Sequence, residues 1–185
     1  MTLMMEMIAL PNYADINGRP MKKLQIQQYL RKLQLNDFEP AINLATLTKL
    51  QDAHLKYIPY ENFDCLNGKI TSLKRQDMFN KVIMHNRGGI CFELNGLYNW
   101  LLESLSFDVT SYSARFIDKM ETYQLRRHRV MCVALGDKRY LTDVGVNSES
   151  PRVPLEITEG LIQSDGISQY KFCLLYTSPS PRDTR

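Results

Sequence analysis

The chain has 185 residues, of which 44% are hydrophobic and 23% charged, so it can bury one ordinary core or two small ones. Its 23 basic and 20 acidic residues give a net charge of +3 without a basic stripe, which argues against a nucleic-acid partner. No stretch approaches the roughly 20 apolar residues of a membrane span, and the opening residues lack a basic leader. We therefore expect a cytoplasmic protein with no membrane partner.

The first part of the chain is predicted to be helical. Residues 1–21, punctuated by proline and glycine, are expected to form an amino-terminal arm. Apolar residues then recur at helical spacing, and proline or paired glycines mark helix ends. The predicted helices cover residues 22–35, 45–57, 74–86 and a segment that begins near Cys91. Residues 22–105 are therefore predicted to form a helical domain.

After Phe107 the pattern changes to short runs rich in β-branched and aromatic residues: DVTSYSARF, HRVMCVAL and RYLTDVGV. Residues 106–172 are therefore predicted to form an antiparallel β domain, and the fold class is α+β. Residues 173–185 include SPSPRDTR, which resembles a cloning or sequencing-adaptor scar. We expect this tail to be non-native and leave it out of the fold prediction.

The four cysteines form no CxxC pair, which argues against a zinc site and a disulfide scaffold, and no metal is expected. Cys91 follows Arg87-Gly88-Gly89-Ile90 and opens a predicted helix, where the helix dipole and free backbone N–H groups favour a thiolate. The glycines allow the close approaches that lift a nucleophile into a cleft. The alternative for such a cysteine is inert packing, which is also the prediction for Cys65 and Cys132.

A predicted hairpin brings His128 near Asp143. A two-residue turn at Gly136-Asp137 pairs Leu135 with Lys138, so Asp143 faces Val130, and His128 lies on the same sheet face, diagonal to Asp143. A carboxylate beside an imidazole fixes its tautomer and raises its proton affinity, as a base for a thiol requires. A three-residue turn would separate the two side chains, and a surface histidine beside a strand-end aspartate is the alternative.

Three segments in order resemble the arylamine N-acetyltransferase family: HLKYIPYENFD at 54–64, RGGICFELN at 87–95 and RYLTDVGV at 139–146. The resemblance covers about residues 22–172. It implies a helical bundle domain followed by an antiparallel β-barrel-like domain, with a papain- or transglutaminase-like cysteine triad at their junction. Any one of these motifs would be unspecific, whereas the ordered set is specific.

The resemblance also implies roles for individual residues. Cys91 matches the nucleophile, His128 the imidazole and Asp143 the orienting carboxylate. Glu61 and Arg87 match an ion pair that supports the active-site loop, which also includes Gly88 and Gly89. Acetyl-CoA is the implied co-substrate, with no tightly bound cofactor, and the acceptor is an aromatic amine or hydrazine.

Two alternatives remain beside acetyl transfer. A thiol hydrolase of transglutaminase or papain type would use the same three side chains, with water in place of the amine. A catalytically silent fragment is the other, because the family continues into a third, mixed α/β domain that the resemblance does not find here. The oligomeric state, the acceptor amine and the range of acyl-CoA donors are not predicted.

Overall fold

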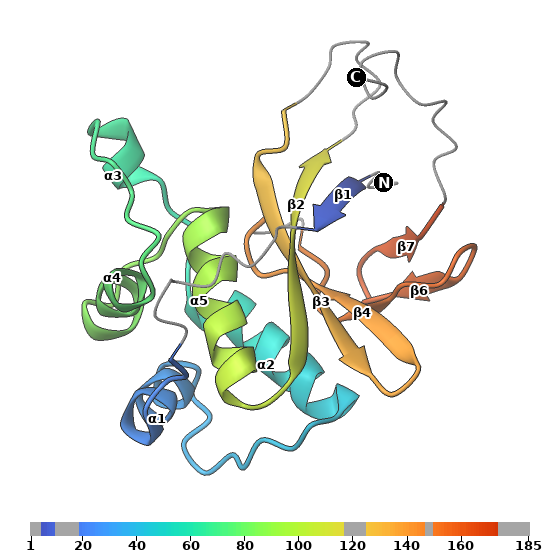
Figure 1. Ribbon diagram of the computed structural model, residues 1–185, viewed down its shortest axis with the longest axis horizontal. Helices are drawn as coiled ribbons and strands as arrows, with labels where there is room; N and C mark the ends of the chain where they lie inside the picture. The colour runs from blue at the N-terminus through green and yellow to red at the C-terminus, as the bar shows by residue number, and fades with distance from the viewer. Residues whose placement is uncertain (1–4, 10–18, 117–124, 147–149, 174–185) are drawn as a thin grey trace.

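The computed structural model describes residues 5–9, 19–116, 125–146 and 150–173, and it places a layer of helices against one face of an antiparallel sheet (Figure 1). The helical layer consists of α1 (Lys23–Lys32), α2 (Leu44–Tyr57), α3 (Phe63–Leu66), α4 (Arg75–Phe79), the π-helical turn η1 (Asn80–Met84) and α5 (Cys91–Ser104). No helix in these described ranges is both long enough and apolar enough to span a membrane.

All four predicted helices are present, as α1, α2, α4 continued by η1, and α5. Local sequence explains their limits. The Asn43 side chain caps α2 by accepting a hydrogen bond from the backbone N–H of Thr46 at 2.8 Å, and Pro59 follows soon after the helix ends. The short helix α3 was not predicted, because four residues are too few to establish a helical period.

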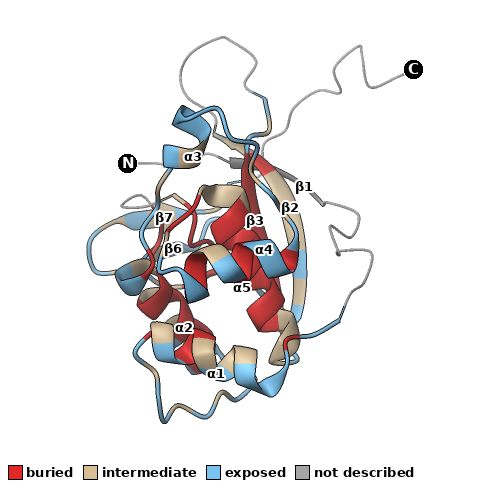
Figure 2. Ribbon diagram, turned by 90° about the vertical axis from the view of Figure 1, so that its left-hand side faces the viewer, coloured by how far each residue is buried: buried red, intermediate tan, exposed pale blue. Residues whose placement is uncertain are grey.

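The helix that begins at Cys91 is the centre of the molecule. It packs against α4 on one side and against β2 (Asp108–Phe116) and β3 (His128–Leu135) on the other. Its residues from Glu93 to Leu102 are all buried, and Figure 2 shows this helix largely in the colour of buried residues. Because α5 is enclosed on several sides, packing fixes the position of Cys91 at its start.

The main sheet has the strand order β1-β2-β3-β4-β5, with every neighbouring pair antiparallel. Its remaining strands are β1 (Met5–Ala9), β4 (Lys138–Thr142) and β5 (Leu155–Glu156), and a separate hairpin consists of β6 (Ile162–Ser164) and β7 (Gln169–Lys171). Met5–Ala9 lies within the segment predicted as an arm.

The prediction of a barrel-like β domain is wrong for the described residues: β1 and β5 remain the edges of an open sheet. The two-residue strand β5 is too short to close it.

The predicted register of the β3–β4 hairpin is confirmed. Leu135 pairs with Lys138 across the Gly136-Asp137 turn, and Met131 pairs with Thr142 at the other end of β4. Gly136 has φ +61°, a left-handed conformation that glycine adopts without steric cost. Asp143 follows directly after the last residue of β4, so its position relative to β3 is set by this ladder.

Buried apolar side chains lie on both faces of the sheet. The larger core lies between the helices and the sheet and includes Leu97, Leu101, Met131 and Val133. A smaller core on the opposite face consists of Ala114, Val130, Leu141 and Leu155, with side chains of the β7 segment packed against it. This second core explains why β3 is buried at successive positions rather than at alternate ones.

Candidate active site

Cys91 is the first residue of α5 and is half-buried. Its Sγ lies 3.5 Å from the backbone carbonyl oxygen of Arg127, the residue just before β3. The thiol therefore lies at the positive end of a helix and beside the start of a strand from the other layer. Both the helix dipole and the unpaired N–H groups of the first turn stabilise negative charge at such a position.

The two glycines before Cys91 are required by close contacts. A Cβ on Gly88 would overlap the carbonyl oxygen of Pro59, and one on Gly89 would lie 2.9 Å from a carboxylate oxygen of Glu93. The carbonyl of Gly89 accepts a hydrogen bond from the backbone N–H of Glu61 at 3.0 Å. A larger residue at Gly88 would push the loop away from the segment that follows α2, and one at Gly89 would push it away from the Glu93 side chain.

His128 and Asp143 are in contact inside the molecule. Nε2 of His128 lies 2.6 Å from Oδ2 of Asp143, and the side chains are 3% and 2% exposed. Cys91 lies close enough to His128 to contribute to its electrostatics. Burial lowers the pKa of His128, but the interactions with Asp143 and Cys91 outweigh burial and hold that pKa above its usual value.

Asn95 was missed in the sequence analysis, although it lies in the segment RGGICFELN. Its Nδ2 donates to Oδ1 of Asp143 at 2.9 Å and to the backbone carbonyl of Arg129, and its Oδ1 accepts from the backbone N–H of Val144 at 2.9 Å. It lies four residues after Cys91, on the same face of α5. That spacing is the signal that could have identified it.

Gly145 was also missed as a site residue. Its backbone N–H donates to Oδ1 of Asp143 at 2.8 Å. A Cβ there would lie 2.6 Å from Nδ2 of Asn95 and 2.9 Å from Cα of Cys91. The segment after β4 therefore approaches α5 so closely that only glycine fits.

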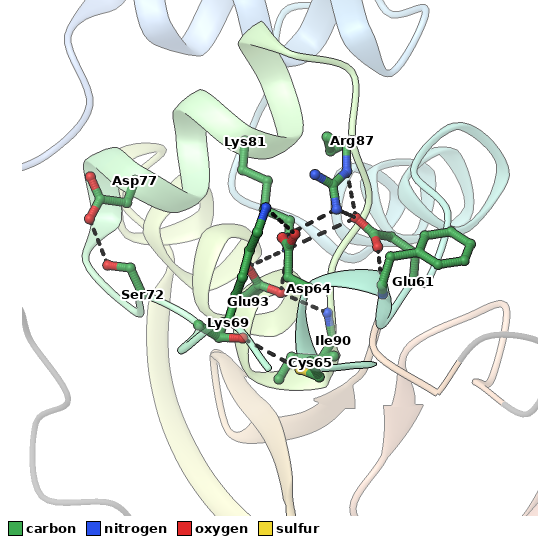
Figure 3. Close-up of polar contacts among 12 residues, drawn as sticks. Glu61, Asp64, Cys65, Lys69, Ser72, Asp77, Lys81, Arg87, Ile90 and Glu93 are labelled. Carbon is green, nitrogen blue, oxygen red and sulfur yellow. Dashed lines mark hydrogen bonds and ion pairs between the residues drawn. The ribbon is translucent and has the colours of Figure 1, made fainter. Parts of the chain in front are cut away.

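Glu61 and Arg87 form an ion pair beside the loop, with Nη2 of Arg87 and Oε1 of Glu61 2.7 Å apart (Figure 3). Arg87 also lies 3.2 Å from Oδ2 of Asp64. Hydrogen bonds with Glu61 and Asp64 raise the pKa of Arg87, and hydrogen bonds with Lys81 and Arg87 lower the pKa of Asp64. Lys81 and Glu93 complete this charged cluster, and neither they nor Asp64 were singled out from the sequence.

The other histidines and cysteines lie away from this site or are exposed. His54 is fully buried between the rings of Tyr29 and Tyr98, and His85 is exposed. Cys132 is buried, but the prediction that Cys65 is a packing residue is wrong, because Cys65 is exposed on α3. Within the described residues, no group of three or more His, Cys, Asp or Glu side chains is arranged to hold a metal ion.

Comparison with known proteins agrees with this architecture. Residues 43–178 match the family model described as N-acetyltransferase. The chain is 34% identical over 149 residues to the arylamine N-acetyltransferase of Mycolicibacterium smegmatis, covering 77% of this chain and 54% of that protein. It is 31% identical over 132 residues to the Escherichia coli arylamine N-acetyltransferase, covering 71% and 47%.

Solved structures give the same result. The arylamine N-acetyltransferase of Salmonella typhimurium superposes with a TM-score of 0.73 at 29% identity, covering 78% of this chain and 52% of that one. The helical layer packed on an antiparallel sheet is therefore a fold that this chain shares with solved arylamine N-acetyltransferases. The chain belongs to the arylamine N-acetyltransferase family. It spans about half the length of the curated relatives it matches.

Proposed function

We propose that the chain transfers an acetyl group from acetyl-CoA to an arylamine or hydrazine through an acetyl-cysteine at Cys91. Acetyl-CoA is the co-substrate, and no tightly bound cofactor takes part. One observation carries the proposal: the buried, hydrogen-bonded pair of His128 and Asp143 lies close enough to Cys91, at the amino terminus of α5, for that thiol to raise the pKa of His128. The relatives named arylamine N-acetyltransferases support an arylamine as the acceptor.

In the first half-reaction, His128 takes the thiol proton of Cys91. Its Nε2 faces Asp143, which leaves Nδ1 as the ring nitrogen for that proton. The thiolate attacks the thioester carbonyl of acetyl-CoA, a bond forms between that carbon and Sγ, and the bond to the coenzyme sulfur breaks. The proton on His128 passes to the departing coenzyme thiolate, and Cys91 carries the acetyl group.

In the second half-reaction, the amine nitrogen attacks the acetyl carbonyl on Cys91. The bond to Sγ breaks, and His128 takes the proton that the nitrogen loses and returns it to the Cys91 sulfur. Arylamines and hydrazines suit this step because they are largely uncharged nucleophiles near neutral pH. Alkyl amines such as lysine are protonated there and lack the lone pair that the step needs.

The other predicted site residues have supporting roles in this proposal. Glu61 and Arg87 hold the loop before Cys91 through their ion pair, and Gly88 and Gly89 let the loop pass close to the residues around it. The three reacting side chains come from the helical and the β parts, so the site is at their junction. We place the reaction in the cytoplasm, where thiols such as Cys91 stay reduced.

Acetyl-CoA incubation followed by mass spectrometry tests the proposal. The expected result is an acetyl adduct on the peptide that contains Cys91, which disappears when an arylamine is added and acetylarylamine forms. The matched control is Cys65→Ala, which removes an exposed thiol outside the site. Cys91→Ala should abolish the adduct, whereas Cys65→Ala should leave it unchanged.

Three other outcomes would contradict the proposal. An adduct that forms on Cys65 or Cys173 as readily as on Cys91 would remove Cys91 as the specific nucleophile. A chain that forms no adduct, although Cys91 is rapidly alkylated by iodoacetamide, would favour a thiol hydrolase. A chain with neither property would be a catalytically silent fragment.

A further inference from the structure

Lys81 lies at the centre of the charged cluster beside the loop that leads to Cys91 (Figure 3). Its Nζ lies 2.9 and 3.1 Å from the two carboxylate oxygens of Glu93 and 2.9 Å from Oδ2 of Asp64. Glu61 is further away, at 3.9 Å. The side chain of Lys81 is 16% exposed and that of Glu93 is 3% exposed, so the contact between them is largely shielded from water.

Glu93 connects this ammonium group to the start of the nucleophile's helix. Its Oε2 accepts a hydrogen bond from the backbone N–H of Ile90, the residue immediately before Cys91, at 3.0 Å. The same oxygen is the atom that a Cβ on Gly89 would meet at 2.9 Å. The position of the Glu93 carboxylate therefore determines where Gly89 and Ile90 lie, and Lys81 holds both oxygens of that carboxylate.

Lys81 is the second residue of the π-helical turn η1. Within η1, the backbone N–H of His85 donates to the carbonyl of Asn80 at 2.9 Å, a span of five residues. The carbonyl of Lys81 accepts from the N–H of Arg87 at 3.1 Å. Single π-helical turns of this kind are frequent at functional sites. Lys81 thus contacts the loop through its backbone and the first turn of α5 through its side chain.

The charge of the cluster depends on Lys81. Three carboxylates, of Glu61, Asp64 and Glu93, face two cations, Lys81 and Arg87, which leaves one net negative charge. Loss of Lys81 would leave two. Burial lowers the pKa of Lys81, but hydrogen bonds with Glu93 and Asp64 raise it overall, so the ammonium stays charged at neutral pH. An added negative charge near a thiol disfavours the thiolate.

We propose that Lys81 is a positioning residue for Cys91: it fixes the Glu93 carboxylate at the amino terminus of α5 and balances the negative charge beside the thiol. The inference rests on the proposed role of Cys91 as the nucleophile. Among the described residues, titratable groups near this thiol include His128, with Asp143 behind it, and Tyr60, whose pKa is raised by burial and by the nearby Cys91. Lys81 acts through Glu93, not by contact with a substrate.

The test measures iodoacetamide alkylation of Cys91 as a function of pH, by peptide mass spectrometry on the 185-residue chain. Lys81→Gln should slow alkylation at neutral pH about tenfold, which corresponds to an upward move of about one unit in the midpoint of the pH profile. Lys81→Arg should restore most of the rate, because it restores the charge. The matched control, Lys23→Gln on the exposed start of α1, should match the unmodified chain.

A double variant separates charge balance from packing. Lys81→Gln combined with Glu93→Gln returns the cluster to one net negative charge, and the new side chain at position 93 keeps an amide oxygen for the N–H of Ile90. Its alkylation rate at neutral pH should return to within about threefold of the rate of the unmodified chain, because a midpoint shift of about half a pH unit changes that rate about threefold. A double variant as slow as the single one, or a single variant as fast as the unmodified chain, would overturn the proposal.

Folding of each variant is checked by circular dichroism. If Lys81→Gln alone fails to fold, the double variant carries the test, and its failure to fold would also overturn the inference. Alkylation needs no acetyl-CoA, so the two proposals fail separately. A chain that forms no acetyl adduct but shows the Lys81 effect loses only the proposed acetyl transfer, whereas a chain that forms the adduct without the Lys81 effect loses only this inference.

Discussion

Asn95 connects all three segments that carry the reacting side chains. It projects from α5, four residues after Cys91, and bonds to the residue after His128 and to both Asp143 and Val144. Every one of these bonds is buried, so water cannot replace them. A single amide side chain therefore sets the relative positions of the helix, the strand β3 and the segment after β4.

Asn95→Ala should destabilise the chain strongly. The N–H of Val144 and the carbonyl of Arg129 would be left buried without this partner, at a cost of about 1–3 kcal/mol for each group. Urea denaturation measures the loss in the free energy of unfolding. The control is Asn36→Ala at an exposed position, which should change that free energy by less than about 0.5 kcal/mol. A loss in the Asn95 variant no larger than in this control would contradict the assigned role.

Asp143→Asn tests the carboxylate without changing the size of the side chain. The hydrogen bond with Asp143 opposes the burial that lowers the pKa of His128, so its loss should lower that pKa. Fewer molecules would then hold an imidazolium beside a Cys91 thiolate at neutral pH. Alkylation of Cys91 by iodoacetamide should slow about tenfold or more, since each pKa unit changes the population tenfold. Asp52→Asn, which alters only an exposed pair with Lys56, should have no effect on the rate.

Among the elements, the β3–β4 hairpin was predictable because its signals are local. A two-residue turn and alternating residues determine the register, and the register places Asp143 relative to His128. The helices over 22–35, 45–57 and 91 onward were predictable from apolar periodicity for the same reason. Whether a sheet is open or closed depends instead on pairing between its two edge strands, which lie far apart in the sequence. Local patterns do not report that pairing, so the barrel prediction was wrong.

The charged cluster could not have been derived from the sequence in the same way. A helical period over 74–86 does not say which distant side chain faces Lys81, because Glu93 lies on another helix and its approach depends on how the two helices pack. Asp64 lies on α3, a helix too short to be recognised from its pattern. The pairing of Glu61 with Arg87 came from resemblance to a family, whereas the contacts of Lys81 depend on three-dimensional packing alone.

Gly145→Ala tests how closely the segment after β4 approaches α5. A Cβ there would overlap Asn95 and the backbone of Cys91, so the cost should be about 1–3 kcal/mol, as in other overpacked sites. The rate of Cys91 alkylation should also fall, because Cys91 or Asn95 must move. Gly136→Ala in the hairpin turn is the comparison: its left-handed φ makes the change cost about 1–2 kcal/mol. Equal alkylation rates in the two variants would show that Gly145 matters only for stability.

At the scale of the whole molecule, two buried histidines respond to pH in opposite directions. His54, enclosed by α1, α2 and α5, has its pKa lowered by burial to about 3, whereas His128 has its pKa raised by Asp143 and Cys91. A raised pKa gives stability that is complete below the unfolded value of 6.5 and is lost as the pH rises through the folded value. A lowered pKa gives the reverse dependence. The two effects together favour maximum stability near the unfolded histidine pKa.

The loss of stability on the acidic side of that maximum can be assigned to His54. Between pH 6.5 and about 3 the unfolded chain binds a proton at this histidine that the folded chain does not, so each unit of acidification should lower the free energy of unfolding by about 1.4 kcal/mol. His54→Phe keeps an aromatic ring between Tyr29 and Tyr98 and should flatten this slope, whereas His85→Gln at the surface should not. Urea denaturation between pH 6.5 and 5 avoids most carboxylate titration. Equal slopes in the unmodified chain and in His54→Phe would mean that acid does not act through the helical core.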